Sequence, residues 1–382
     1  MSTVTRKEVS STTLKPKTLR FVAKAKDFLN ALLPIGSVAP SRSPRPILSH
    51  FKITVAGKGV EACATDLDMW VTAGMELADS TGEGMFALPA EAFLQILKEA
   101  GDGEVSVSVR EGGAVLVEVG KDRYEVSCLS SDEFPPCAER VEEPRWTLAG
   151  GTLPALLRRT AFAAARERTR YTLNGVYWHV EDGRVEVVAT DGRRLALARA
   201  NVKGAHKATG ILPLRTVSQM GQFGDQAVTL AMGERAVEVR TVATRPAHTL
   251  VSRLLEGQYP NYQSVIPKDY PNVATASAPE LLAAFRRAAL LSQESRAVRL
   301  VFRKGGLTLT GGDPGRGQAK IEVDLDYKGT EVDLRLNPDF IMEGLKTWGD
   351  QPVRWEIRDA VSPCVLKEGD DYLYVVLPIT LE

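Results

Sequence analysis

The sequence predicts an α+β protein made of three repeated domains, and three observations support this fold class. First, distinctive markers return about every 125 residues, as in the tripeptide at 64–66 that recurs at 189–191. Second, each repeat contains two segments with the apolar spacing of an amphipathic helix. Third, short segments of alternating polar and apolar residues, separated by glycine-rich turns, lie between these helices, as in antiparallel sheets.

Each repeat is predicted to contain an early helix and a later one. The early helices are expected at 25–33, 153–162 and 279–288, and the later ones begin at Pro89, Pro213 and Pro338. Proline is tolerated there, because the first turn of a helix does not use its own N–H groups. Segments 105–109 and 307–310 have the alternation of strands. The period is far longer than that of a solenoid, so each repeat should hold its own core.

Proline-rich segments mark the expected domain boundaries. They lie at 135–144 and 266–272, where proline disfavours a continuing helix or a central strand. The first 17 residues are rich in Ser, Thr and Lys and are typical of a flexible tail. We therefore predict a tail at 1–17 and domains at 18–144, 145–270 and 271–382.

The composition is that of a globular protein with balanced charge. There are 48 Lys and Arg residues and 48 Asp and Glu residues, and 44% of the residues are hydrophobic. The four cysteines form no C-x-x-C pair, so free thiols in a reducing cytoplasm are expected. No apolar run approaches the roughly 20 residues of a membrane span, and no apolar signal segment follows the first methionine. A cytoplasmic location is expected.

The stretch VATDGRRLAL at 188–197 raises the question of whether Asp191 is a chemical group or a turn former. An alternating segment precedes it, and Asp-Gly favours a type I′ hairpin turn. Asp66 and Asp313 stand at related points of the other repeats. The four histidines lack the spacing of metal ligands, and 311–317 lacks the Gly-Lys-Ser/Thr of a phosphate loop. We therefore interpret Asp191 as a turn former and expect no catalytic residue, no metal and no cofactor.

Six motifs together resemble one known family. They lie at 45–48, 172–176, 189–195, 259–267, 289–294 and 374–381. In this combination they are similar to the bacterial DNA polymerase III beta subunit, the sliding clamp, over about residues 18–382. The resemblance implies three clamp domains per chain, each with two helices packed on antiparallel sheet. It also implies a head-to-tail homodimer, a six-domain ring around double-stranded DNA that acts as a non-catalytic processivity factor. Leu290 and Leu291 match its dimer interface.

Simple geometry agrees with a dimeric ring. A domain of about 125 residues has a radius of gyration of roughly 14 Å. Three such domains in a triangle leave a hole of only about 5 Å, whereas six in a hexagon leave roughly 36 Å. A DNA duplex is roughly 20 Å wide, so three domains cannot encircle it and six can.

The resemblance also implies a pocket between the second and third domains that binds a short partner peptide containing Gln and Leu or Phe. The matching positions are Leu173, Thr190, Gly192, Arg193, Arg194, Leu195, Pro260, Val265, Val375, Leu377, Pro378 and Ile379. Their apolar members suit leucine or phenylalanine anchors, and Arg194 at the rim offers donors to peptide carbonyls. Arg193, Pro363 and Thr380 depart from the family, which has histidine, serine and arginine there.

Partners and DNA contacts follow from the same resemblance. The implied partners are the polymerase III catalytic subunit, the clamp loader, translesion polymerases, mismatch-repair proteins and ligase, each of which would bind through a short linear motif. No interaction with a membrane is implied. The DNA-binding positions are Arg42, Arg45, Arg166, Tyr171 and Thr172, whereas Glu91 and Glu167 replace family contacts, which Arg166 or Arg168 could take over. Helical cations that could attract phosphates are Lys24, Lys26, Lys98, Arg158, Arg159, Arg215, Arg286, Arg287 and Lys346.

Two alternatives stay open from the sequence. A metal-dependent hydrolase built on the repeated aspartates is the rival from another class. A specialised duplicate clamp that confers drug resistance has the same chemistry as a primary clamp, so the residues do not separate the two.

Overall fold

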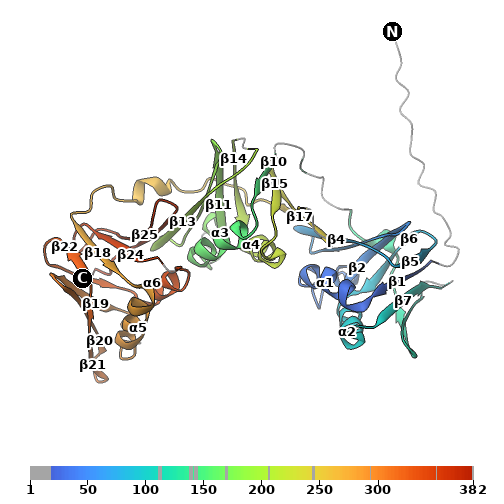
Figure 1. The fold of residues 1–382 in the computed structure, drawn as a ribbon, viewed down its shortest axis with the longest axis horizontal. Coiled ribbons are helices and arrows are strands. Elements are labelled where there is room, and N and C mark those ends of the chain that lie inside the picture. Colours follow the sequence, from blue (N-terminus) through green and yellow to red (C-terminus); the bar gives the residue numbers. More distant parts are fainter. Residues whose placement is uncertain are drawn as a thin grey trace, which may run out of the picture. The chain divides into compact units, whose positions relative to one another are not determined.

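The computed structural model describes residues 19–110, 114–136, 141, 145–167, 171–204, 207–242, 246–292, 294–349 and 351–380. The tail predicted at 1–17 and Arg168 lie outside these residues. By its internal contacts the chain divides into two compact units. The first comprises residues 1–139 and 243–250, and the second comprises 140–242 and 251–382. Figure 1 shows the elements of both.

The first unit has two helices and two groups of antiparallel strands. The helices are α1 (Ala25–Gly36) and α2 (Ala90–Ala100). One sheet has the order β5 (Asp79–Thr81), β1 (Arg20–Lys24), β7 (Glu104–Val109), β8 (Ala114–Val119), β9 (Asp122–Ser127). The other group has the order β4 (Met69–Glu76), β3 (Gly59–Thr65), β2 (His50–Ala56), β6 (Gly84–Pro89). The helices α1 and α2 lie beside each other (Figure 1). Between them, the rings of Phe28 on α1 and Phe93 on α2 pack edge to face with centroids 5.4 Å apart.

The second unit contains a long sheet that passes through two of the predicted repeats. Its order among the described residues is β14 (Ala208–Pro213), β11 (Gly175–Glu181), β12 (Arg184–Thr190), β13 (Arg194–Asn201), β26 (Tyr372–Val376), β25 (Cys364–Glu368), β24 (Val353–Ile357), β18 (Asn272–Ala276), β22 (Asp326–Lys328). Strands β13 and β26 pair antiparallel from Arg194 opposite Val376 to Ala198 opposite Tyr372. The last strand of the chain is thereby joined to the strand that follows Asp191.

The second unit also contains a second sheet, further strands and helices. A second sheet has the order β21 (Gly317–Asp324), β20 (Gly306–Asp313), β19 (Val298–Arg303), β23 (Val332–Leu336). Strands β10 (Arg145–Leu148), β15 (Val228–Met232) and β16 (Ala236–Thr241) pair in that order, and β17 (Ala247–Arg253) is divided between the two units. The helices are α3 (Thr152–Thr160), α4 (Leu214–Met220), α5 (Ala278–Ala289) and α6 (Pro338–Leu345). Trp355 is 1% exposed and packs edge to face on Phe302 at 5.3 Å.

The six predicted helices are all confirmed, and their prolines mark the start of the later ones. Pro338 is the first residue of α6, whereas Pro89 and Pro213 each stand one position before their helix, with the extended backbone of a capping residue. The helices α1 and α2 pack together, and so do α5 and α6. Mixed helix and antiparallel sheet in each repeat is the predicted α+β class.

Candidate functional site

The turn at 191–193 is held by two side chains that bond to its own backbone. The Thr190 hydroxyl donates to the Arg194 carbonyl at 2.6 Å and accepts from the Gly192 amide at 3.0 Å. Asp191 Oδ1 accepts from the amides of Arg193 and Arg194 at 2.9 and 3.1 Å. These bonds account for the donors of a tight turn, so the structure confirms Asp191 as a turn former.

The predicted type I′ geometry at this turn is wrong. Type I′ requires a positive φ at both central residues, Asp and Gly alike. Gly192 has φ +86°, but Asp191 is not among the residues with positive φ. The Asp-Gly turn with both angles positive is one hairpin earlier, at Asp182 (φ +51°) and Gly183 (φ +76°), between β11 and β12. The loop at 191–193 differs because the Asp191 side chain, rather than the backbone alone, closes it.

The first unit repeats the three amide bonds of this turn. Thr65 Oγ1 accepts from the Leu67 amide at 3.0 Å, and Asp66 Oδ1 accepts from the amides of Asp68 and Met69 at 3.1 and 2.8 Å. Leu67 has φ +81°, as Gly192 has +86°. The repeated Ala-Thr-Asp tripeptide therefore encodes a turn rather than a chemical group. Asp313 does not share this arrangement, because its carboxylate bonds to a different loop.

Arg194 is buried at the start of β13 and is fully engaged by its own chain. Its side chain bonds to Asp191 Oδ2 through Nε at 3.0 Å, to the Phe162 carbonyl through Nη2 at 3.0 Å, and to Glu343 through Nη1. Its guanidinium lies over the Phe340 ring at 4.4 Å. We call these side chains, with Tyr374, the Arg194 network. Arg194 is 7% exposed, so the prediction that it offers donors from a solvated rim is wrong.

Arg194 is the one cation of the Arg194 network and faces two carboxylates, Asp191 and Glu343. Burial lowers the pKa of Arg194, but Tyr374 and Glu343 raise it by charge and hydrogen bonds, and the net pKa lies above the usual value. Tyr374 is buried, which raises its pKa, and its hydroxyl donates to the Phe340 carbonyl at 2.8 Å. Arg194 thus stays charged and joins the turn after β12, the segment that follows α3, and α6.

A cleft of about 1020 Å³ opens beside the Arg194 network. Its walls come from the segment after α3, from the turn at 191–194, from α6 and from the chain after β26. They include Ala164, Ala165, Arg166, Glu167, Asp191, Arg193, Arg194, Ser295, Arg296, Asn337, Asp339, Phe340, Glu343, Leu377, Pro378, Ile379 and Thr380. Leu377 is 41% exposed, and its amide donates to the Arg193 carbonyl at 3.0 Å, which fixes the two walls together.

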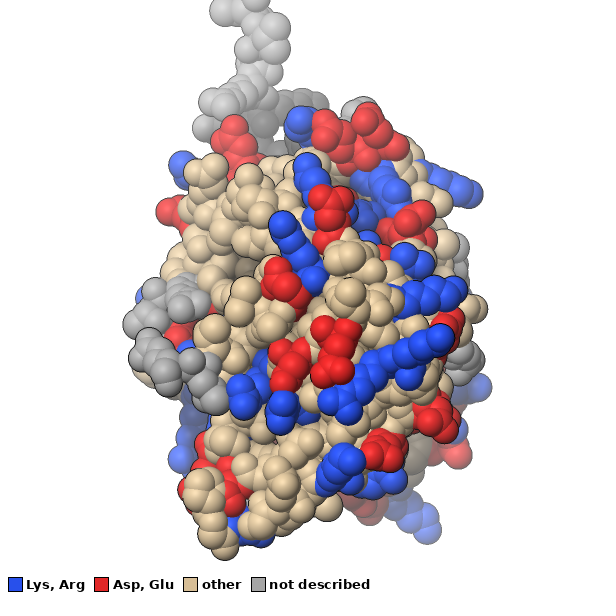
Figure 2. All heavy atoms as spheres, turned by 90° about the vertical axis from the view of Figure 1, so that its left-hand side faces the viewer, with Lys and Arg blue, Asp and Glu red and all other residues tan. Residues whose placement is uncertain are grey.

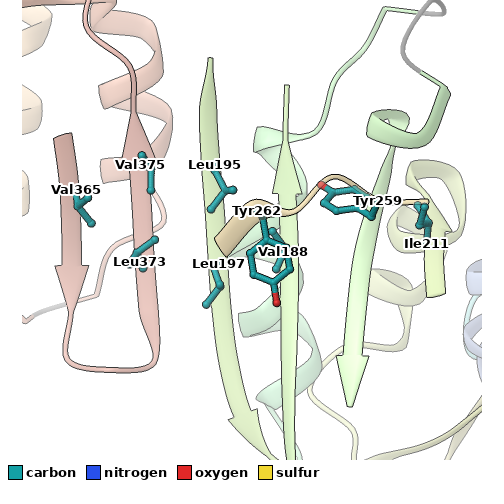
Figure 3. Packing of buried hydrophobic residues seen from close by; sticks show 9 residues of the cluster. All are labelled: Val188, Leu195, Leu197, Ile211, Tyr259, Tyr262, Val365, Leu373 and Val375. Carbon is teal, nitrogen blue, oxygen red and sulfur yellow. The ribbon is translucent and has the colours of Figure 1, made fainter. Parts of the chain in front are cut away.

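The structure brings five of the twelve predicted pocket residues into this cleft. These are Arg193, Arg194, Leu377, Pro378 and Ile379. Side chains alternate along a strand, so Leu195 and Val375 face away from Arg194. They lie in a buried cluster on the other face, with Val188, Leu197, Ile211, Tyr259, Tyr262, Val365 and Leu373, and Leu173 packs against it (Figure 3). Val375 has no exposed surface, and Leu195 is 3% exposed.

The segment at 259–266 crosses that other face and is anchored by tyrosines. Tyr259 stacks on Tyr177 with ring centroids 5.0 Å apart, and the Tyr262 hydroxyl donates to Glu186 Oε2 at 2.6 Å. Burial raises the pKa of both phenols of this segment. Pro260 and Val265 are exposed here, Val265 by 48%. The predicted pocket residues therefore divide between the cleft, the turn and this apolar face.

The residues predicted to touch DNA lie in both units. In the first, Arg42 and Arg45 are exposed on the loop before the short helix at 46–49, and Ser43 Oγ accepts from the Arg45 amide at 3.1 Å. In the second, Tyr171 is 58% exposed and Thr172 half-buried at the start of the short helix at 171–174. Arg166 lines the cleft together with predicted pocket residues.

Among the helical cations, Arg159 and Lys26 form ion pairs within the chain. Arg159 pairs with Glu368 and lies over the Tyr372 ring at 5.0 Å, and Lys26 pairs with Asp102 at 3.0 Å. Figure 2 presents the side of the molecule where β18 and β22 lie, and there Lys and Arg are interspersed with Asp and Glu. Ion pairs on β19 also bring together charges of both signs, such as Arg299 with Asp333, and Arg303 with Glu331 at 3.1 Å.

The sequence did not point to Phe340, Glu343 or Arg296, which the fold adds to the cleft, or to Phe162, whose carbonyl accepts from Arg194. Phe340 and Glu343 could have been found from the sequence, because they are three residues apart on a predicted helix and so lie on one face of it. Within the described residues no group of three or more His, Cys, Asp or Glu side chains could hold a metal ion. No helix of the same residues is long and apolar enough to cross a membrane.

Three family models match the chain in order. They are the DNA polymerase III beta subunit N-terminal domain over residues 19–138, its central domain over 147–261 and its C-terminal domain over 263–380. The Beta sliding clamp of Pseudomonas aeruginosa is 28% identical over 372 residues, which covers 95% of this chain and 100% of the relative. That of Chlamydia muridarum is 27% identical and covers 95% and 99%.

Solved structures are similar over the same length. A sliding clamp from Pseudomonas aeruginosa bound to griselimycin has a TM-score of 0.90 at 27% identity, and the match covers 95% of this chain and 100% of that one. The beta sliding clamp of C. crescentus has a TM-score of 0.87 at 28% identity, with the same coverage.

Proposed function

Because this chain belongs to the family of bacterial DNA polymerase III beta subunits and is a DNA sliding clamp of replication, we propose that its cleft at 191–194 and 377–380 is the site where partner proteins bind. The protein acts without catalysis. Two chains close head to tail through Leu290 and Leu291 into a ring around duplex DNA. Leu290 is 67% exposed, as an unfilled interface position would be in a single chain. The domains correspond to 18–144, 145–270 and 271–382, and the ring works in the cytoplasm.

The observation that carries the binding site is the exposed apolar run beside a rigid turn. Leu377 directly follows the buried strand β26 but is itself 41% exposed, and Pro378 and Ile379 continue the apolar surface. The Leu377 amide is fixed to the Arg193 carbonyl, and the Ile379 amide donates to the Arg335 carbonyl at 2.8 Å. Exposed, preorganised apolar groups bind a leucine or phenylalanine anchor with little ordering cost.

The partners proposed are proteins that carry a short peptide with Gln and Leu or Phe. They include the polymerase III catalytic subunit, the clamp loader, translesion polymerases, mismatch-repair proteins and ligase. Leu173, Pro260 and Val265 add apolar surface on the opposite face of the sheet, where the segment at 259–266 lies. Thr190 and Gly192 shape the turn at 191–193. DNA is contacted through Arg42, Arg45, Arg166, Tyr171 and Thr172, without reading of bases, because these contacts would go to phosphates.

The test is peptide binding by a variant that loses one anchor contact. Leu377→Ala should reduce the affinity for a fluorescent peptide with Gln, Leu and Phe by about 5- to 150-fold, or about 1–3 kcal/mol, because it removes a contact at the centre of the site. Fluorescence anisotropy measures this. Val361→Ala is the matched control, because Val361 is 67% exposed but does not line the cleft, and it should bind normally. Normal binding by a folded Leu377→Ala variant would refute the site.

A further inference from the structure

The third repeated aspartate has a role that the peptide site does not explain. Asp313 ends β20 and is 4% exposed. Its Oδ2 accepts from the Glu294 amide at 2.7 Å, and its Oδ1 accepts from the Ser295 amide at 3.0 Å. These bonds lower the pKa of Asp313, so it stays ionised at neutral pH. A buried carboxylate thus fixes the backbone of the loop that follows α5.

This loop holds Arg296 in a conformation that arginine rarely adopts. Arg296 has φ +46°, a left-handed conformation that is sterically unfavourable for a residue with a Cβ. Its amide donates to the Ser292 carbonyl at 3.2 Å. The loop cannot relax toward the sheet, because α5 and β20 are in close contact. A Cβ on Gly311 would lie 2.1 Å from the Ala288 carbonyl oxygen.

Arg296 lines the same cleft as Arg193 and Leu377. The buried cation of the cleft, Arg194, is neutralised by Asp191 and Glu343. Arg296 has no ion pair with another residue of the described chain. The fold thus holds Arg296 in a rare backbone conformation, and it places a guanidinium without an ion-pair partner in the described chain at the wall of the cleft.

We propose that Arg296 is a specificity-determining residue that binds a carboxylate of the partner peptide, and that Asp313 is the residue that positions it. This inference rests on the proposed function of the cleft. A guanidinium offers two parallel donors to a carboxylate, which gives affinity and orientation together. Among the described residues, four arginines and four carboxylates line the cleft, so this lining has no net charge, and Leu377, Pro378 and Ile379 add an apolar surface. This combination suits a single carboxylate held by Arg296 better than an extended polyanion.

The experiment uses three fluorescent peptides and the full-length chain. All peptides contain the Gln, Leu and Phe anchors. One ends in a free carboxylate, one ends in an amide but carries an aspartate beside the anchors, and one has an amide end and asparagine in that place. The two acidic peptides separate a terminal from a side-chain carboxylate. The variants are Arg296→Gly, which tolerates the positive φ, and Arg296→Lys, which keeps the charge.

The matched control is Arg299→Gln. It also removes one positive charge, three positions further on, but Arg299 pairs with Asp333 and does not line the cleft. We expect Arg296→Gly to lose about tenfold in affinity for at least one acidic peptide and to bind the neutral peptide as the unmodified chain does. Arg296→Lys should recover part of the loss. The melting temperature of Arg296→Gly should not fall, because glycine relieves the backbone strain.

Asp313→Asn tests the positioning role, since it removes one acceptor and should reproduce the loss for the same peptide while the neutral peptide still binds. Equal affinity of Arg296→Gly for all three peptides would overturn the inference and leave the peptide site intact. So would an Arg296→Gly variant that loses retention on linear duplex DNA instead of the acidic peptide, because the ligand would then be phosphate. If no peptide binds the unmodified chain, the proposed site itself fails, and this inference fails with it.

Discussion

At the residue scale, Asp191 and Asp66 form the same hydrogen bonds in two different surroundings. Each carboxylate accepts from two backbone amides of its own turn, but only Asp191 also holds Arg194 beside the cleft. Variants of these two residues can therefore distinguish what the turn contributes to the stability of the chain from what it contributes to peptide binding.

Asp191→Ala and Asp66→Ala should both destabilise the chain, by about 1–3 kcal/mol, because each leaves turn amides without their acceptor. Thermal melts and urea unfolding measure the loss. Asp191→Ala should in addition weaken peptide binding, whereas Asp66→Ala should not. If both variants bind the peptide equally well, the turn at 191–193 does not shape the cleft. If Asp191→Ala removed some activity without a change in stability, its carboxylate would have a chemical role.

Glu343 provides a second matched pair, with Asp339 one turn earlier on the same helix. Both line the cleft, but Glu343 pairs with Arg194 and Asp339 does not. Glu343→Gln should weaken peptide binding by roughly fivefold, or about 1 kcal/mol, because Glu343 is partly exposed and the ion pair is partly screened. Asp339→Asn should leave binding unchanged.

Amide hydrogen exchange separates this positioning role from a simple change of charge. Exchange at Leu377, whose amide bonds to the turn, should become faster in Glu343→Gln and stay the same in Asp339→Asn. Equal effects of the two variants on binding and exchange would mean that the charge of the cleft matters and the Arg194 network does not.

At the scale of elements, α6 carries the floor of the cleft and is fixed at both of its ends. Asn337 caps it by accepting from the Asp339 amide at 2.9 Å, and Pro338 fits the first turn. Gly344 allows its close approach to β26, because a Cβ there would lie 2.4 Å from the Tyr374 ring. The position of Phe340 and Glu343 over Arg194 depends on this contact.

The contact of β17 with α1 in the first unit should make stability depend on pH. His248 on β17 is 4% exposed, and its Nε2 donates to the Ala31 carbonyl at 3.0 Å. Burial lowers the pKa of His248 below its ordinary value near 6.5. The folded chain therefore binds this proton more weakly than the unfolded chain, and the free energy of unfolding should fall as the pH drops below about 6.5.

Urea unfolding between pH 5 and pH 7.5 tests this dependence. His248→Asn should flatten the slope in the acidic half of this range, whereas His50→Asn, at a half-buried position, should keep it. An unchanged slope in His248→Asn would assign the acid sensitivity to other groups.

At the scale of the whole molecule, the net charge of zero suits a protein that is held on DNA by topology. Charges of both signs are mixed on the face in Figure 2, so long-range attraction to phosphates stays weak and depends on salt. A ring needs mobile contacts rather than tight ones, because it must slide.

The ring itself is tested by the mass of the protein in solution. Light scattering at micromolar concentration should give about twice 41.6 kDa. Replacing Leu290 and Leu291 by glutamate should give a folded monomer that still binds the peptide, and this variant should not stay on nicked circular DNA at high salt. Leu377→Glu is the reciprocal control, which should stay dimeric and lose the peptide. A stable monomer of the unmodified chain would exclude the ring.

The sequence by itself determined the repeat, the helices and the position of the turn at 191–193, although not the type of that turn. These features depend on local physics, since apolar periodicity, proline at a helix start and an aspartate that bonds to its own backbone need no distant partner. For this reason the helices and the role of Asp191 could be predicted, and the resemblance of six motifs was enough to identify the family.

Only the tertiary structure decided which side chains share a face and which are buried. The pairing of β13 with β26 joins residues about 180 positions apart, and it turns Arg194 toward α6 while Leu195 and Val375 turn into the tyrosine cluster. The burial of Arg194 depends on Phe162, Glu343 and Phe340, which no local pattern places beside it. Burial and ion pairing are properties of the packed chain, so a residue predicted as a solvated donor became a buried structural cation.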